Sequence, residues 1–133
     1  MTTDATVKVQ NHALHSRQYL ENALAILQSG EAGKAGELLW GCVTQAAQAV
    51  AAARNRDVKT HRDLKNFVLQ LARDLADETI RKDFLVAESL HSNFYAIGQE
   101  PQDIAIVVPD VQRLVTRLLD LIPPELREQQ PVR

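Results

Sequence analysis

Apolar residues recur at intervals of three and four along most of the sequence, and this spacing constrains the fold more than any other feature. Side chains three and four residues apart share one face of an α-helix. The pattern is clear after residue 60, where the repeated positions are Leu64, Phe67, Val68, Leu71 and Leu75. Each apolar stripe has to be buried against another helix. The spacing therefore predicts an all-α protein.

The stripes, together with residues that start or stop helices, divide the chain into five helical segments. Gly30 and Gly98 are suited to end the first and the fourth segment. Thr60 and Asp77 are candidate N-caps for the third and the fourth, because their side chains can accept hydrogen bonds from a first helical turn. The helices are expected at residues 4–29, 31–53, 60–75, 77–97 and 109–122.

The start of the last helix is the least obvious boundary. Residues 104–108, Ile-Ala-Ile-Val-Val, are the one stretch that could form a strand, but no partner run exists elsewhere. Proline is favoured in the first turn of a helix, so Pro109 is the predicted start. Short links between amphipathic helices favour an antiparallel up-and-down bundle of four main helices plus a fifth C-terminal helix. We expect one domain over residues 1–124 and a polar, flexible tail over 125–133.

Composition and charge limit the location and the partners of the protein. The net charge of −2 gives no overall basic field, so any contact with nucleic acid must come from a local patch. Cys42 is the one cysteine, and its apolar helical surroundings predict a buried structural thiol. The beginning of the sequence lacks the pattern of a signal peptide, and no run approaches the roughly 18 apolar residues of a membrane span. We expect a cytoplasmic protein without a membrane partner.

The second helix carries two ambiguous features. Trp40 lies off the main stripe, together with Ala47 and Ala51, which indicates either a second packed face within the monomer or a dimer surface. Glycines at 33, 36 and 41 weaken a helix, each by about 1 kcal/mol relative to alanine. They indicate either close packing against another helix or a frayed first turn.

The link between the second and third helices is the first candidate site. Five basic and two acidic residues lie between Arg54 and Lys65. The third helix also presents unpaired backbone N–H groups there, so a phosphate group would be stabilised on both counts. Arg56, Lys59 and Arg62 are the candidate binding residues. The alternative is a solvated linker whose charges contact no ligand.

The same link contains a possible catalytic pair. Arg54 is followed by Asn55 and, after six intervening residues, by His61. The histidine could exchange a proton with a ribose hydroxyl or a leaving oxygen during RNA cleavage, while the arginine stabilises the phosphate charge. The simpler alternative for His61 is a first-turn residue beside the capping threonine.

Glu88, His91 and Tyr95 form the second candidate site, because their spacing places them on one face of the fourth helix. A Glu-x-x-His pair is half of a two-metal carboxylate site, but even with Glu37 the ligands are too few, so no metal and no cofactor are predicted. A core histidine hydrogen-bonded to Glu88 or Tyr95 is the favoured interpretation. A ligand pocket lined by these side chains is the alternative.

Three runs of residues together resemble the HEPN superfamily, named for nucleotide binding in higher eukaryotes and prokaryotes. They are Ala35–Trp40, Ala46–Val50 and Thr60–Leu64. The later run Ala87–Tyr95 resembles, more narrowly, the PaREP-type branch described from archaea. The resemblance covers roughly residues 5–120. It implies a bundle of four to five helices that is usually dimeric, and it implies that a partner protein encoded nearby often acts beside it.

The resemblance leaves two functions open. Many HEPN relatives are metal-independent ribonucleases with an arginine, a polar residue and a histidine at the spacing of Arg54, Asn55 and His61. In non-catalytic relatives a Thr-His-Asp-Leu-like segment starts the third helix, and Thr60–Leu64 fits that pattern as well. The favoured expectation is a dimeric module that binds a nucleotide or a partner protein. The alternative is an endoribonuclease in which paired Arg54 and His61 sites meet across a dimer cleft.

Overall fold

The computed structural model of the chain describes residues 4–92 and 100–127. Within these ranges the chain forms five α-helices and one short 3-10 helix, and no strand. The elements are α1 (Asp4–Gln28), α2 (Ala32–Ala53), α3 (His61–Asp74), α4 (Glu78–Ser92), α5 (Pro101–Asp120) and η1 (Pro124–Leu126). The prediction of an all-α protein with five helices is confirmed. The predicted helix end at Gly98 lies outside the described residues.

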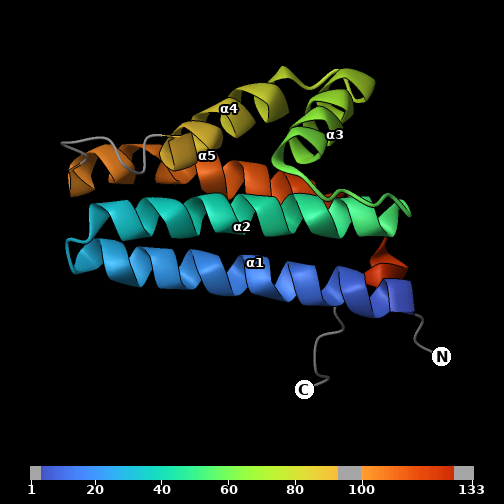
Figure 1. Cartoon of the computed structure of the whole chain (residues 1–133), viewed down its shortest axis with the longest axis horizontal. Helices are drawn as coiled ribbons and strands as arrows, with labels where there is room; N and C mark the ends of the chain where they lie inside the picture. The colour runs from blue at the N-terminus through green and yellow to red at the C-terminus, as the bar shows by residue number, and fades with distance from the viewer. Residues whose placement is uncertain (1–3, 93–99, 128–133) are drawn as a thin grey trace.

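Helix α2 is the central element and contacts all four other α-helices. Helix α1 packs antiparallel along one side of it, whereas α5 runs in the same direction as α2 (Figure 1). Helices α3 and α4 lie obliquely across the remaining side of α2 (Figure 1). The expected antiparallel up-and-down bundle of four main helices with a fifth alongside is not confirmed by this arrangement.

The small side chains of α2 explain how one helix can have so many neighbours. Its fully buried alanines leave room for other helices on several sides; they are Ala35, Ala46, Ala47, Ala49 and Ala51. A Cβ atom added at Gly41 would lie only 3.0 Å from Cδ2 of Tyr19 on α1. Close helix packing therefore accounts for this glycine. Trp40 is 6% exposed and packs inside the monomer, with its ring edge-on to Phe84.

Cys42 lies in the contact between α1 and α2 and is fully buried. The hydroxyl of Ser16, also fully buried, donates a 2.7 Å hydrogen bond to the backbone carbonyl of Cys42. Burial raises the pKa of the Cys42 thiol to about 11, although its contact with the Ser16 hydroxyl acts in the opposite direction. The prediction of a buried structural thiol is confirmed.

Helix α5 begins at Pro101, so the predicted start at Pro109 is wrong, and residues 104–108 are helical rather than extended. The apolar period continues straight through the proline, because Ile104 and Val108 are buried on the same side as Val111. Pro109 is exposed, and so is Ala105, whose carbonyl loses its helical partner. Water can solvate that carbonyl, which is why the helix tolerates an internal proline.

The caps predicted for α3 and α4 are present. The hydroxyl of Thr60 accepts a 3.0 Å hydrogen bond from the backbone N–H of Asp63. The Asp77 carboxylate accepts hydrogen bonds from the N–H groups of Thr79 at 3.0 Å and Ile80 at 3.3 Å. Between these helices, Ala76 closes α3 in a left-handed conformation with φ 51°. Glycine is the usual residue in this position, because a Cβ atom is strained there.

An ion pair with a buried carboxylate joins α4 to α5. Asp83 is 1% exposed, and both of its carboxylate oxygens accept 2.8 Å hydrogen bonds from the guanidinium of Arg113. Arg113 also donates to Asp110 at 2.6 Å, and the pairing with Asp83 and then Asp110 raises the pKa of Arg113 above its ordinary value. The bidentate geometry fixes the register of the two helices.

The chain after α5 folds back onto the molecule. The Arg127 side chain donates to the backbone carbonyls of Ile122 at 2.8 Å and Asp120 at 2.7 Å. Its own carbonyl accepts a 3.3 Å hydrogen bond from Gln10 on α1. The rest of the expected tail, residues 128–133, lies outside the described residues. None of the helices in the described ranges has the length and apolar character needed to cross a membrane.

Candidate functional site

His61 is the first residue of α3, and its imidazole reaches across to α4. Its Nε2 atom lies 2.8 Å from Oε2 of Glu88, and the other oxygen of Glu88 accepts a 3.0 Å hydrogen bond from Nζ of Lys65. Partial burial alone would raise the pKa of Glu88, but the hydrogen bonds from His61 and Lys65 outweigh it and the pKa falls below its ordinary value. An ionised Glu88 therefore orients the imidazole of His61 through Nε2.

His91, near the C-terminal end of α4, is held by a different carboxylate. Its Nδ1 atom lies 2.7 Å from Oε1 of Glu37 on α2. The expected hydrogen bond to Glu88 is absent, because Glu88 turns toward α3 instead, and Tyr95 lies outside the described residues. The His91 side chain is 46% exposed, so the expectation of a core histidine is wrong.

The two histidines meet over Trp40. The indole ring is stacked with the imidazole of His61 at a centroid distance of 5.3 Å and with that of His91 at 5.6 Å. The two imidazole centroids are 5.9 Å apart, with 28° between the ring planes. Trp40 thus forms a buried floor, and the two half-exposed imidazoles lie side by side above it. We call His61 and His91 in this arrangement the histidine pair.

Each member of the histidine pair has one ring nitrogen engaged by a glutamate. Nδ1 of His61 and Nε2 of His91 have no hydrogen-bond partner in residues 4–92 and 100–127. Such nitrogens are free to accept a hydrogen bond from a ligand or to donate one to it, depending on the tautomer. Within the same ranges, no three His, Cys, Asp or Glu side chains are arranged to hold a metal ion.

Arg54 does not join His61 within one chain. It is the C-cap of α2 and follows Trp40, the floor of the histidine pair, by 14 residues. At a helical rise of about 1.5 Å per residue, it lies about 21 Å farther along the axis than the indole that contacts His61. The helix spacing therefore keeps the arginine and the histidine of the Arg-x6-His motif apart.

Asn55 has a structural role at the end of α2. It adopts a left-handed conformation with φ 57°, which asparagine tolerates better than most residues. Its N–H group donates to the carbonyl of Ala52 at 3.1 Å, and the next N–H, of Arg56, donates to Ala51 at 2.8 Å. These two bonds satisfy carbonyls at the end of the helix.

The remaining basic residues of the link have different surroundings. The guanidinium of Arg56 lies 5.6 Å from the ring centroid of Phe67. Lys59 forms a 3.4 Å ion pair with Asp57, and both side chains are largely exposed. Arg62 is exposed and has no ion-pair partner in the part of the chain that the structure describes. The link therefore does not form one continuous basic patch with the histidine pair.

The sequence profile described as the archaeal PaREP1/PaREP8 family matches residues 11–115, which include all three rings of the site. The chain belongs to this family. The narrower part of the family prediction is thereby confirmed for this PaREP1/PaREP8 chain. A search of curated proteins found no match. The family description names no ligand and no reaction.

Three important residues of the PaREP1/PaREP8 site were not assigned to it from the sequence. From the sequence, Trp40 is an ambiguous apolar residue, Glu37 is a possible metal ligand, and Lys65 is the end of the basic stretch. Their spacing along single helices carries no sign that they meet, because the contacts join α2, α3 and α4. The one sequence signal for this site is the presence of glutamates on neighbouring helices that could each hydrogen-bond to a histidine.

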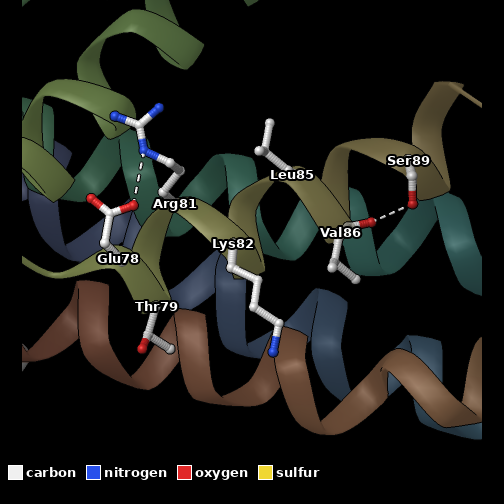
Figure 2. A pocket seen from close by; sticks show the side chains of 7 residues that line it. All are labelled: Glu78, Thr79, Arg81, Lys82, Leu85, Val86 and Ser89. Atoms are coloured by element: carbon white, nitrogen blue, oxygen red, sulfur yellow. Dashed lines mark hydrogen bonds and ion pairs between the residues drawn. The ribbon is translucent and has the colours of Figure 1, made fainter.

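A second surface feature of this PaREP1/PaREP8 member lies on the outer face of α4. A shallow hollow of about 680 Å³ follows that face between Glu78 and Ser89. Figure 2 shows Leu85 projecting from the helix there, with Glu78 and Arg81 paired at one end. The Leu85 side chain is 43% exposed and Lys82 lies in the same hollow. The surface combines an apolar centre with charges of both signs.

Proposed function

We propose that this PaREP1/PaREP8 protein is a homodimeric binding module for a nucleotide and that the histidine pair over Trp40 is its ligand-facing site. The observation that carries the proposal is the presence of two half-exposed imidazoles side by side, each oriented by its own glutamate. A planar base can stack on aromatic rings, and protonated imidazoles beside Lys65 favour a phosphate group. The hydrogen bonds with Glu37 and Glu88 pre-organise the rings, which lowers the entropic cost of binding.

The proposal extends the family assignment to the wider HEPN superfamily, and the all-helical fold is compatible with that relation. It also places the protein in the cytoplasm, where a reduced thiol such as that of Cys42 is stable. A partner protein encoded nearby remains the other ligand class, and it would dock over the same exposed rings.

Nuclear magnetic resonance of the histidine rings tests the nucleotide site. Ring nitrogen signals are followed while AMP, GMP, CMP and UMP are added in turn. We expect the signals of His61 and His91 to shift, while those of His12 and His15 on α1 stay in place. His12 is hydrogen-bonded to Gln45 and His15 is stacked on Tyr19. Both lie outside the histidine pair, so they are internal controls. Equal shifts at all four histidines, or none at the pair, would refute the proposal.

A metal-independent endoribonuclease is the second candidate, and the histidine pair itself favours it. One neutral imidazole can take the proton from a ribose 2′-hydroxyl, while the other, protonated, gives a proton to the leaving 5′ oxygen. The alternative form of this candidate uses Arg54 and His61 from two subunits.

Cleavage of mixed RNA in EDTA distinguishes the two forms. Loss of cleavage in His61→Ala and His91→Ala, with Arg54→Ala active, supports the histidine pair. Loss in Arg54→Ala and His61→Ala, with His91→Ala active, supports the motif shared across a dimer. If the wild-type protein at high concentration does not cleave RNA, the endoribonuclease hypothesis is excluded.

For the homodimer, the outer face of α4 is the surface we propose. Burial of Leu85 against a second copy would remove apolar area from water. Glu78 and Lys82 lie on this one surface, so a twofold axis could place the acidic residue of one copy opposite the basic residue of the other. This self-complementarity is the support for an interface between identical chains.

A further inference from the structure

A polar groove lies on the side of α3 opposite the histidine pair. On a helix, positions 63, 66 and 70 face away from positions 61 and 65, which contact α4. Two adjoining hollows form the groove between α3 and residues 54–58, with volumes of about 480 Å³ and 140 Å³. They share Arg56, Phe67 and Gln70 in their walls. The two hollows therefore adjoin, and they share no lining residue with the histidine pair.

Three guanidinium groups line this groove without a carboxylate partner. They belong to Arg54, Arg56 and Arg73, and none of them forms an ion pair with any described residue. In contrast, Arg113 and Arg117 are each paired with an aspartate. Unpaired arginines along two adjoining hollows are a feature that an anionic ligand would explain.

Neutral groups hold two of these arginines in place. Arg56 lies over the Phe67 ring at 5.6 Å. Arg73 donates a 2.7 Å hydrogen bond to the amide oxygen of Gln70, and the amide nitrogen of Gln70 donates in turn to Asp74 at 2.7 Å. Each guanidinium keeps further N–H donors for a ligand, because the group has five donors in all.

The acidic residues of the groove have other contacts. Asp57 pairs with Lys59, and Asp74 accepts the hydrogen bond from Gln70. Asp63 stands in the first turn of α3, where the positive end of the helix dipole stabilises a carboxylate. All three carboxylates line the same two hollows as the guanidiniums, but none of them forms an ion pair with Arg54, Arg56 or Arg73. The guanidinium N–H groups that have no partner in the described residues are therefore the feature of the groove that an anion could contact.

We propose that this groove binds a ligand with two linked phosphate groups, either inorganic diphosphate or the diphosphate of a nucleotide. Arg54 lines the smaller hollow, Arg73 lines the larger one, and Arg56 lines both, so adjacent phosphates can each contact two guanidiniums. Planar guanidiniums bind phosphate oxygens in a bidentate manner, which suits them to this ligand class. The inference concerns a second site and does not require the histidine pair to bind a nucleotide.

Isothermal titration calorimetry with inorganic diphosphate, ADP and adenosine tests the groove. Diphosphate and ADP should both bind and adenosine should not; stronger binding of ADP than of diphosphate identifies the nucleotide as the source. The affinity should fall as salt is raised, because the contacts are electrostatic. Arg54→Gln combined with Arg73→Gln should weaken diphosphate binding at least about tenfold, through loss of charge-assisted hydrogen bonds.

Arg62→Gln is the matched control, since it removes one unpaired arginine of α3 that does not line the groove. It should leave the diphosphate affinity unchanged, and circular dichroism should show that all variants are folded. Equal weakening by Arg62→Gln, binding of adenosine as tight as that of ADP, or no binding of diphosphate would overturn the inference.

The results also separate this inference from the proposed nucleotide site. If diphosphate binding is lost in His61→Ala and His91→Ala but kept in the groove variants, the ligand sits at the histidine pair and the groove inference fails. If the groove variants lose diphosphate binding while no nucleotide shifts the ring signals of His61 and His91, the groove inference is supported and the proposed function fails.

Discussion

The imidazole rings of His61 and His91 lie 5.9 Å apart above the indole of Trp40, although they belong to different helices. His61 is tied to α4 through Glu88, and His91 is tied to α2 through Glu37. The pair therefore links α2, α3 and α4 through two hydrogen bonds between ionisable groups and through stacking on Trp40. The packing of three helices is therefore coupled to the ionisation of these groups.

The free energy of unfolding should decrease in acid, as the contacts of Glu88 are lost. The folded pKa of Glu88 lies below its ordinary value of 4.5. Its ionised form therefore stabilises the folded chain fully above that ordinary value, and the contribution is lost as the pH falls through the lower, folded pKa. Glu88→Gln should cost at most about 1 kcal/mol at neutral pH, since the group is partly exposed, and should reduce the loss on acidification. Urea denaturation between neutral pH and pH 3 measures both, and an unchanged pH slope would contradict the assignment.

Replacing Ala76 with glycine should stabilise the protein. Ala76 has φ 51°, where a Cβ atom is strained and glycine is not. We expect Ala76→Gly to raise the free energy of unfolding by about 0.5–1 kcal/mol. Ala25→Gly, at an exposed position within α1, is the control and should lower it by about 1 kcal/mol. Chemical denaturation of both variants measures the difference, and a loss of stability in Ala76→Gly would refute the strain argument.

Removal of the proline inside α5 should also stabilise the chain. Pro109 cannot donate a backbone hydrogen bond to the exposed Ala105, so the helix lacks one bond at this position. Pro109→Ala restores the N–H group and should raise the free energy of unfolding by about 1–3 kcal/mol. Thermal and urea unfolding check this, and a destabilised variant would mean that the proline is required for the packing of α5.

The buried Asp83–Arg113 pair should be sensitive to which partner is removed. Arg113→Ala leaves the carboxylate of Asp83, which is 1% exposed, without its bidentate partner; a buried acceptor that loses its partner typically costs about 1–3 kcal/mol. Asp83→Asn should be milder, because Arg113 is half exposed and keeps Asp110. Denaturation of the two variants gives the order, and a larger loss in Asp83→Asn would contradict it.

A charge at the centre of the α4 hollow should disrupt the proposed homodimer. Leu85→Glu would bury an unpaired carboxylate at the interface and should weaken dimerisation at least about tenfold. Leu14→Glu, at a similarly exposed leucine on α1, should leave the dimer intact. Light scattering at tens of micromolar compares the variants. A wild-type monomer, or equal effects of both changes, would exclude this interface.

Local sequence rules predicted the helices because each is specified by residues near one another in the chain. Thr60 and Asp77 are caps that act within one helical turn, and both perform as expected. The predicted start of α5 was wrong because Pro101 and Pro109 both satisfy the same first-turn rule. The apolar pattern at 104–108 was too short to choose between them. Pro101 is the one used, and the buried Ile104 decides it.

The site was harder to predict than the helices, because it depends on how helices cross. The sequence singled out His61, Glu88 and His91 but placed them in two separate sites, with Arg54 as the partner of one histidine. The oblique packing of α3 and α4 against α2 joins the histidines and leaves Arg54 far along the helix axis. The spacing of residues along one helix does not indicate the angle at which that helix crosses another.

The buried thiol of Cys42 gives this chain an internal reporter. Alkylating reagents attack the thiolate, and a pKa of about 11 leaves only about one molecule in a thousand in that form at pH 8. The side chain is also closed off between α1 and α2, and the sequence contains no other cysteine. Labelling by iodoacetamide should therefore follow the separation of these two helices, so that its rate measures how often the native protein opens.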